Sequence, residues 1–205
     1  MTAPARTRTV APAWPLYLAA FAIAAVVAGA VGEAFSGGSL AELGIPDPGA
    51  ATTVGLPALR GVAWLLMALA TGSFLLSAFL IPPKQTQEDL NGARLTVDGH
   101  LASRTGAHAS AGIALIGLAM IPLVLSDVSG QPLKTVLFEA AAWSQALDQV
   151  ADARVWLIVA VFAAVVAAFA YTATSWWSQV WLFVGAIVVV MPIALTGHSA
   201  TGGAH

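Results

Sequence analysis

The feature that most constrains this chain is a long uncharged stretch at residues 155–195, which contains no Lys, Arg, Asp or Glu. It is much longer than the ~20 apolar residues that one helix needs to cross a bilayer. It fits two spans, at about 155–173 and about 177–196, joined by a tight turn near Thr172. Unpaired backbone groups are too costly in hydrocarbon, so these spans must be helical. The sequence therefore predicts a membrane protein with a helical hairpin in its C-terminal part.

Three further apolar segments lie earlier, at about 15–32, 60–81 and 107–125. Pro82 and Pro83 close the second one, because proline lacks the amide proton and restricts the residue before it. A secretory signal is the alternative for the first segment, since Arg6 and Arg8 precede it. We favour an uncleaved span, because the apolar run is longer than a usual signal core and shows no clear cleavage site. The expected fold is an all-α integral membrane protein, a single domain over residues 1–205 with about five transmembrane helices.

Composition excludes several functional classes. The chain is 59% hydrophobic and 9% charged, with a formal net charge of -2, so it lacks the basic surface that nucleic-acid binding needs. It contains no cysteine, which excludes disulfides, thiolate metal sites and cysteine nucleophiles. It also carries no phosphate-binding, metalloprotease or serine-hydrolase motif. We therefore expect a non-enzymatic membrane protein whose obligatory partner is the lipid bilayer.

Basic residues in short loops predict the orientation, because they favour the cytoplasmic side. Five of them fall before the first span or between the second and third: Arg6, Arg8, Lys84, Arg94 and Arg104. We expect the N terminus inside and the C terminus outside, in a multi-pass protein of a bacterial cytoplasmic membrane.

The connecting segments differ in character. Residues 35–59 are rich in Gly and Pro, which predicts an irregular outer cover and not a helix. Residues 131–153 repeat apolar side chains at helical spacing, which predicts an amphipathic helix on the outer membrane surface, seated by Phe138 and Trp143. Residues 82–106 are expected to be a solvated inner connector, with a docking or regulatory segment as the alternative. Glu33 and Arg60 flank the outer ends of the first two spans, so we expect them to pair.

The C-terminal stretch holds the candidate metal ligands, since Met191, His198 and His205 follow one another towards the outside. Met191 and His198 are seven residues apart, which on an intact helix gives one face but a separation of about 10 Å. The Gly- and Ser-rich segment between His198 and His205 lets both imidazoles reach one ion. Imidazole suits copper and zinc, and a thioether suits Cu(I). The sequence predicts an outward-facing copper site with Met191 behind it; the alternative is a polar tail that binds no metal.

A membrane b-type cytochrome is a further alternative, because its haem is held by histidines on different helices. His108 and His198 are expected near opposite faces of the membrane, which is too far apart for one haem.

Three stretches carry a resemblance to a known family: LGIPDPGAATTVGLPALRGVAWLLMALATGSFLLSAFLIPP, LTVDGHLASRTG and the terminal PIALTGHSATGGAH. Together they resemble the N-terminal part of bacterial CopD-like copper resistance/copper transport membrane proteins, in the form fused to a CtaG-like cytochrome c oxidase assembly domain. The resemblance implies copper handling at the outer face, for transport, resistance or delivery to the oxidase, and matches His198 and His205 to the family's histidines. It implies oxidase subunits or an extracytoplasmic copper chaperone as partners.

In such proteins further spans follow the second histidine, so we expect these residues to be a fragment of a longer chain. The competing hypothesis is an accessory or assembly subunit of a respiratory oxidase that has no metal site of its own. Its Ala- and Gly-rich helices would allow close packing against other subunits.

Overall fold

The computed structural model describes residues 14–36, 48–83 and 93–195. All regular elements within these ranges are helical: α1 (Trp14–Ser36), α3 (Ala50–Leu75), the π-helix η1 (Leu76–Leu80), α4 (Val97–Ser129), α5 (Leu133–Phe138), α6 (Ala140–Gln149), α7 (Ala151–Thr172) and α8 (Trp176–Leu195). In this part of the chain five helices are long and apolar enough to cross a membrane, namely α1, α3 with η1, α4, α7 and α8. The all-α membrane fold and the tight turn between the last two spans are confirmed.

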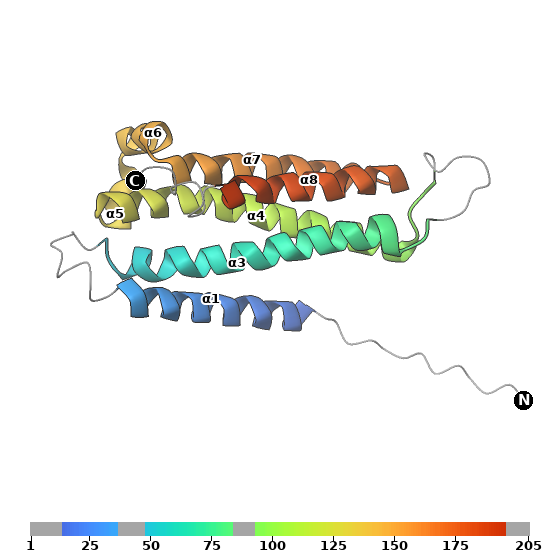
Figure 1. The fold of residues 1–205 in the computed structure, drawn as a ribbon, viewed down its shortest axis with the longest axis horizontal. Helices are drawn as coiled ribbons and strands as arrows, with labels where there is room; N and C mark the ends of the chain where they lie inside the picture. The colour runs from blue at the N-terminus through green and yellow to red at the C-terminus, as the bar shows by residue number, and fades with distance from the viewer. Residues whose placement is uncertain (1–13, 37–47, 84–92, 196–205) are drawn as a thin grey trace, which may run out of the picture.

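Four of these helices form an up-and-down bundle in the cyclic order α3, α4, α7, α8, with the most extensive contacts between α4 and α7 (Figure 1). Helices α3 and α7 therefore lie on one diagonal, and α4 and α8 on the other. Helix α1 lies outside the bundle and packs chiefly on α3, with only 6% of its most apolar stretch buried. The core of the described protein is accordingly a four-helix bundle with α1 added at its side.

The two ends of the bundle are built differently. The α5–α6 end is where α3 begins, where α4 ends and where α5 and α6 lie (Figure 1). Here Ser126 donates its hydroxyl proton to the Gln131 carbonyl at 2.6 Å, so Thr52 is the donor in its 2.7 Å bond to Ser126. This buried chain of hydrogen bonds joins the start of α3 to the end of α4.

The hairpin end is where α7 turns into α8, and here the α3–α4 connection pairs with that turn. Arg94 and Ser175 form an isolated antiparallel bridge. On either side of it, the Trp176 amide donates to the Ala93 carbonyl at 2.9 Å and the Leu95 amide to the Thr174 carbonyl at 3.2 Å. These bonds fix the level of α8 relative to α4.

Helices α3 and α4 extend well beyond the apolar segments of the sequence. The helix from Ala50 to Leu80 has 31 residues and α4 has 33, against the ~20 that a span requires. The prediction of irregular structure over residues 35–59 is wrong from Ala50 onward. Gly49, at φ 90°, turns the chain, and its carbonyl accepts hydrogen bonds from the Thr52 and Thr53 amides. Packing against α1 and α4 then keeps the helix intact through Pro57.

The connector predicted over residues 82–106 is also shorter than expected, because α4 begins at Val97. The Thr96 hydroxyl accepts a hydrogen bond from the Gly99 amide at 3.2 Å, and Asp98 lies in the first turn. A hydroxyl cap and an early carboxylate both stabilise a helix N-terminus. The prediction of a connector over residues 82–106 is therefore wrong for its last ten residues.

The segment predicted as one amphipathic helix over residues 131–153 is helical but interrupted. It divides into α5, α6 and the first turn of α7, with breaks at the extended residues Glu139 and Val150. Val136 is buried against the core, whereas Phe138 is exposed. The segment thus caps the end of the bundle, and its contact with the membrane surface stays a prediction.

Candidate functional site

The predicted copper ligands lie on and after α8. Met191 is one turn before the end of this helix, with 52% of its surface exposed, and Pro192 follows it within the helix. His198 and His205 lie outside the described residues. Helix α8 runs from the hairpin end towards the α5–α6 end but stops well short of it, since Leu195 lies only six residues past Val189, which packs level with Met67 and Ile113 (Figure 1). The ligand set itself stays a prediction.

Carboxylates outnumber cations at this end of the described protein. The acidic residues here are Glu33, Asp127, Glu139, Asp148 and Asp152, and the basic residues are Arg60, Lys134 and Arg154. An excess of one charge raises the local concentration of ions of the opposite sign. Ions attracted to the α5–α6 end are therefore cations.

Arg60 pairs with a different carboxylate than the sequence suggested. Its guanidinium lies 3.7 Å from a carboxylate oxygen of Asp152 on α7, and both side chains are nearly half exposed. Glu33 instead accepts a hydrogen bond of 3.3 Å from the Thr53 hydroxyl. The register of α1 on α3 places Thr53 opposite Glu33, and Arg60 lies two turns further along the helix. The predicted Glu33–Arg60 pair is therefore wrong.

Two other histidines lie on α4 near the hairpin end. His100 Nε2 accepts a hydrogen bond of 3.4 Å from Arg104 Nε, and His108 Nδ1 donates to the Arg104 carbonyl at 2.6 Å. His108 also packs edge-on against the ring of Tyr171 on α7, with 5.5 Å between ring centres. In the described ranges no three His, Cys, Asp or Glu side chains come together as a metal-binding group.

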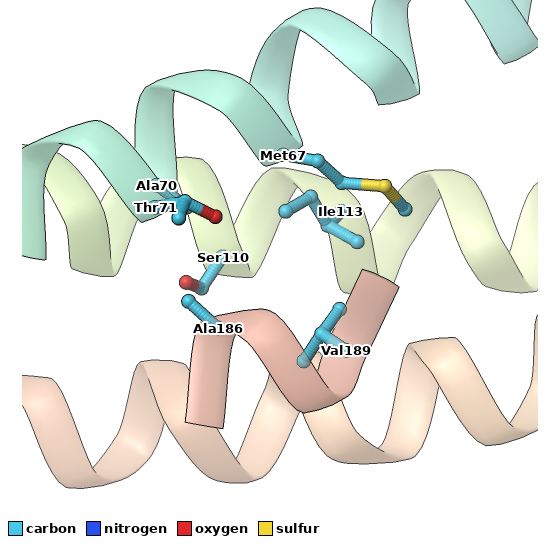
Figure 2. A pocket seen from close by; sticks show the side chains of 7 residues that line it. All are labelled: Met67, Ala70, Thr71, Ser110, Ile113, Ala186 and Val189. Atoms are coloured by element: carbon cyan, nitrogen blue, oxygen red, sulfur yellow. The ribbon is translucent and has the colours of Figure 1, made fainter. Parts of the chain in front are cut away.

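A small cavity lies inside the bundle between α3, α4 and α8 (Figure 2). It is too narrow to hold a water molecule and is lined by Met67, Ala70, Thr71, Ser110, Ile113, Ala186 and Val189. Figure 2 shows the Met67 thioether and the Thr71 and Ser110 hydroxyls among these side chains. The cavity thus combines one soft sulfur with two hydroxyl groups in an otherwise apolar lining.

Two further buried polar side chains, Ser103 and Gln179, lie closer to the hairpin end than this cavity. Ser103 precedes Ser110 by seven residues on α4, and Gln179 precedes Ala186 by seven residues on α8. Seven residues are two helical turns, so Ser103 lies on the same inward face of α4 as Ser110, and Gln179 on the same face of α8 as Ala186. Both are about 10 Å closer to the hairpin end than the cavity. Gln179 is 0% exposed, and neither its amide group nor the Ser103 hydroxyl has a hydrogen-bond partner. Burying such unpaired groups costs about 1–3 kcal/mol each.

The helix next to these two side chains is irregular, because α3 ends in the π-helix η1. The Ile81 amide bonds to the Leu76 carbonyl five residues back at 3.0 Å. The Ala78 carbonyl accepts a hydrogen bond of 2.6 Å from the Trp176 indole, and the Ser77 hydroxyl donates to the Gly99 carbonyl at 2.9 Å. Single π-helical turns are frequent at functional sites. We name Ser103, Gln179 and η1 the polar layer.

The polar layer was not predicted from the sequence, because only charged residues within the spans were considered. Gln179 is the one Gln or Asn within residues 155–195, and a polar amide in a predicted span is a signal that can be read without a structure. The π-helix left no comparable trace, since LSAFL contains neither Gly nor Pro.

Comparison with known proteins supports the copper interpretation. A search of curated proteins and a search of solved structures each give no match. A family profile described as the copper resistance protein D-like, N-terminal domain, matches residues 50–205. The match begins at the first residue of α3, so it covers the four-helix bundle with α5 and α6 and leaves α1 outside. With about three quarters of its residues matched, the chain belongs to the copper resistance protein D-like family.

Proposed function

We propose that this protein handles copper at the outer face of a bacterial cytoplasmic membrane, with His198 and His205 as ligands and Met191 behind them. The observation that carries the proposal is the extent of the family match, which continues past the end of α8 to residue 205 and so includes both histidines. Membership in a copper resistance family favours copper over zinc as the ion that these imidazoles bind.

The electrostatics of the bundle support this location. Helix α8 points towards the α5–α6 end, where carboxylates exceed basic side chains. A negative end attracts copper cations in either oxidation state. The half-exposed Met191 thioether lies one turn before the end of α8 and suits Cu(I). In this proposal the histidines receive copper and Met191 offers a second position on the membrane side.

Copper content after copper exposure tests the proposal. The full-length protein is purified with the replacements His198→Ala and His205→Ala together, and metal is measured by mass spectrometry. The matched control replaces His100 and His108 by Ala, which removes the same number of imidazoles from the hairpin end. We expect copper to be lost in the first variant and retained in the second. Equal retention in both variants, or equal loss, would overturn the assignment.

Within this function, the protein serves copper transport, copper resistance or delivery to the copper centres of cytochrome c oxidase. Delivery would require a CtaG-like domain, an oxidase subunit or an extracytoplasmic copper chaperone as the partner. No catalytic step is part of the proposal, because receiving and passing an ion needs ligands and a path only.

A second candidate function is that of an accessory oxidase subunit, and the peripheral position of α1 favours it. This helix packs chiefly on α3 through its glycines and leaves the rest of its apolar surface exposed, which is available for contact with another membrane subunit. The test is co-purification in mild detergent. A stable complex with oxidase subunits that survives loss of both His198 and His205 would favour this role over metal handling.

A further inference from the structure

Helix α4 carries a single basic residue, Arg104, beside a face that is otherwise largely apolar. Leu101, His108 and Leu115 are exposed and seven residues apart, so they form one outward stripe on this membrane helix. Arg104 lies beside the stripe with its side chain partly buried. A charged group on such a face needs a counter-ion, because an uncompensated charge at a bilayer is costly.

The Arg104 guanidinium is held in place by neutral groups. Its Cζ lies 5.3 Å from the centre of the Tyr171 ring, which is a cation–π distance. Its Nε donates to His100 Nε2, so this imidazole nitrogen is unprotonated, and His108 packs edge-on against the same Tyr171 ring. In the described part of the chain the one ion pair is that of Arg60 with Asp152, at the opposite end. No carboxylate described here neutralises Arg104.

Arg104 lies near headgroup depth. The hydrogen bonds from Trp176 to Ala78 and from Ser77 to Gly99 place α8, η1 and the start of α4 at one level. The exposed Trp177 and Trp181 follow on α8, and tryptophan collects at the boundary between headgroups and hydrocarbon. Arg104 is about 7 Å further in along α4, within reach of the headgroups for a long arginine side chain.

We propose that Arg104, fixed by Tyr171 and His100, binds the phosphate of an anionic phospholipid at the hairpin end. The planar guanidinium is preorganised against the aromatic ring, and its two terminal amino groups match a pair of phosphate oxygens. Basic pockets between membrane helices are known to take anionic headgroups. A lipid is favoured over a soluble anion because Arg104 lies beside the lipid-facing stripe.

The experiment is a lipid titration followed by native mass spectrometry of the full chain. Phosphatidylglycerol and phosphatidylcholine with the same acyl chains are compared, so that the net charge of the headgroup is the variable. We expect tighter binding of phosphatidylglycerol, and an affinity about fivefold lower after Arg104→Gln, the factor for one basic residue near a membrane surface. Arg104→Lys keeps the charge and should retain an intermediate preference.

Two controls make the result decisive. Arg154→Gln removes an exposed cation from the opposite end and should leave the phosphatidylglycerol affinity unchanged. Equal losses in the Arg104 and Arg154 variants, or no discrimination between the two lipids, would overturn the site. Inorganic phosphate is added as a competitor: displacement of phosphatidylglycerol at equal concentration would assign Arg104 to a soluble anion and overturn the lipid.

Discussion

Helix α4 has two contrasting faces, one packed against α7 and one turned to the bundle interior. Against α7 the backbones are so close that a Cβ on Gly117 would lie 2.9 Å from Ala160 Cβ and 3.0 Å from the Trp156 carbonyl oxygen. Across the bundle from α8, the same helix instead faces the cavity and the polar layer, with unpaired groups at Ser103 and Gln179. The comparison teaches that one helix can combine a close-packed face with a face that keeps polar groups inside the bundle. The face towards α7 is close-packed, and the face towards the bundle interior holds buried polar groups without partners.

The largest expected effect comes from breaking the close-packed face. Gly117→Ala inserts a methyl group against backbone atoms of α7, which cannot move aside cheaply, and should destabilise the protein by about 3 kcal/mol. The measurement is the unfolding midpoint in detergent.

Gly72→Ala is the matched control for this substitution, because apart from the adjacent backbone of its own helix no atom lies within 4 Å of the position that its Cβ would take. It should be neutral or slightly stabilising, since alanine is the better helix former. Equal destabilisation by both substitutions would mean that the α4–α7 contact is not the close one.

The next effect has the opposite sign and tests the polar layer. Gln179→Leu replaces an unpaired buried amide by an apolar side chain of similar size, so the free energy of unfolding should rise by about 1–2 kcal/mol. The unfolding midpoint and the copper content are measured on the same preparation. A lower midpoint would show that Gln179 has a bound partner in the membrane, and the unpaired state would then be rejected.

A smaller loss should follow Trp176→Phe, which removes the indole donor to the Ala78 carbonyl next to η1. One such hydrogen bond contributes about 1 kcal/mol. Trp177→Phe is the matched control, because this neighbouring indole is exposed. If both variants unfold at the same midpoint, the Trp176 bond does not hold α8 against the π-helix.

Much of the fold was predictable from the sequence, and the failures share a physical cause. Hydropathy located the five spans, and Pro82 marked the end of the second because it has no amide proton. Hydropathy measures transfer into hydrocarbon, so it missed the helix before Arg60 and the first turns of α4. The first turns of α4 are capped by the Thr96 hydroxyl. The start of α3 is held by the hydrogen bond between Thr52 and Ser126.

The candidate site was predictable in part. Sequence reasoning placed Met191 within the last span, and the structure has it near the end of α8. The partner of Arg60 was not predictable, because the separation of two residues across a membrane face depends on how the helices pack. Predicting the polar layer requires knowing how α4 and α8 are aligned along the bundle. The sequence of neither helix alone gives this alignment.

The smallest expected effect concerns the other diagonal of the bundle, between α3 and α7. Arg60 and Asp152 join this diagonal at the α5–α6 end, but both side chains are more than two-fifths exposed. Water and salt screen such a pair, so a double-mutant cycle with Arg60→Gln and Asp152→Asn should give a coupling of about 0.2–1 kcal/mol that shrinks at high salt. Arg60→Gln with Asp148→Asn is the control cycle and should show no coupling. A coupling of several kcal/mol would mean that the pair lies in the low-dielectric part of the membrane and is not screened. The α3–α7 diagonal would then contain a strong polar interaction, unlike the close-packed contact between α4 and α7.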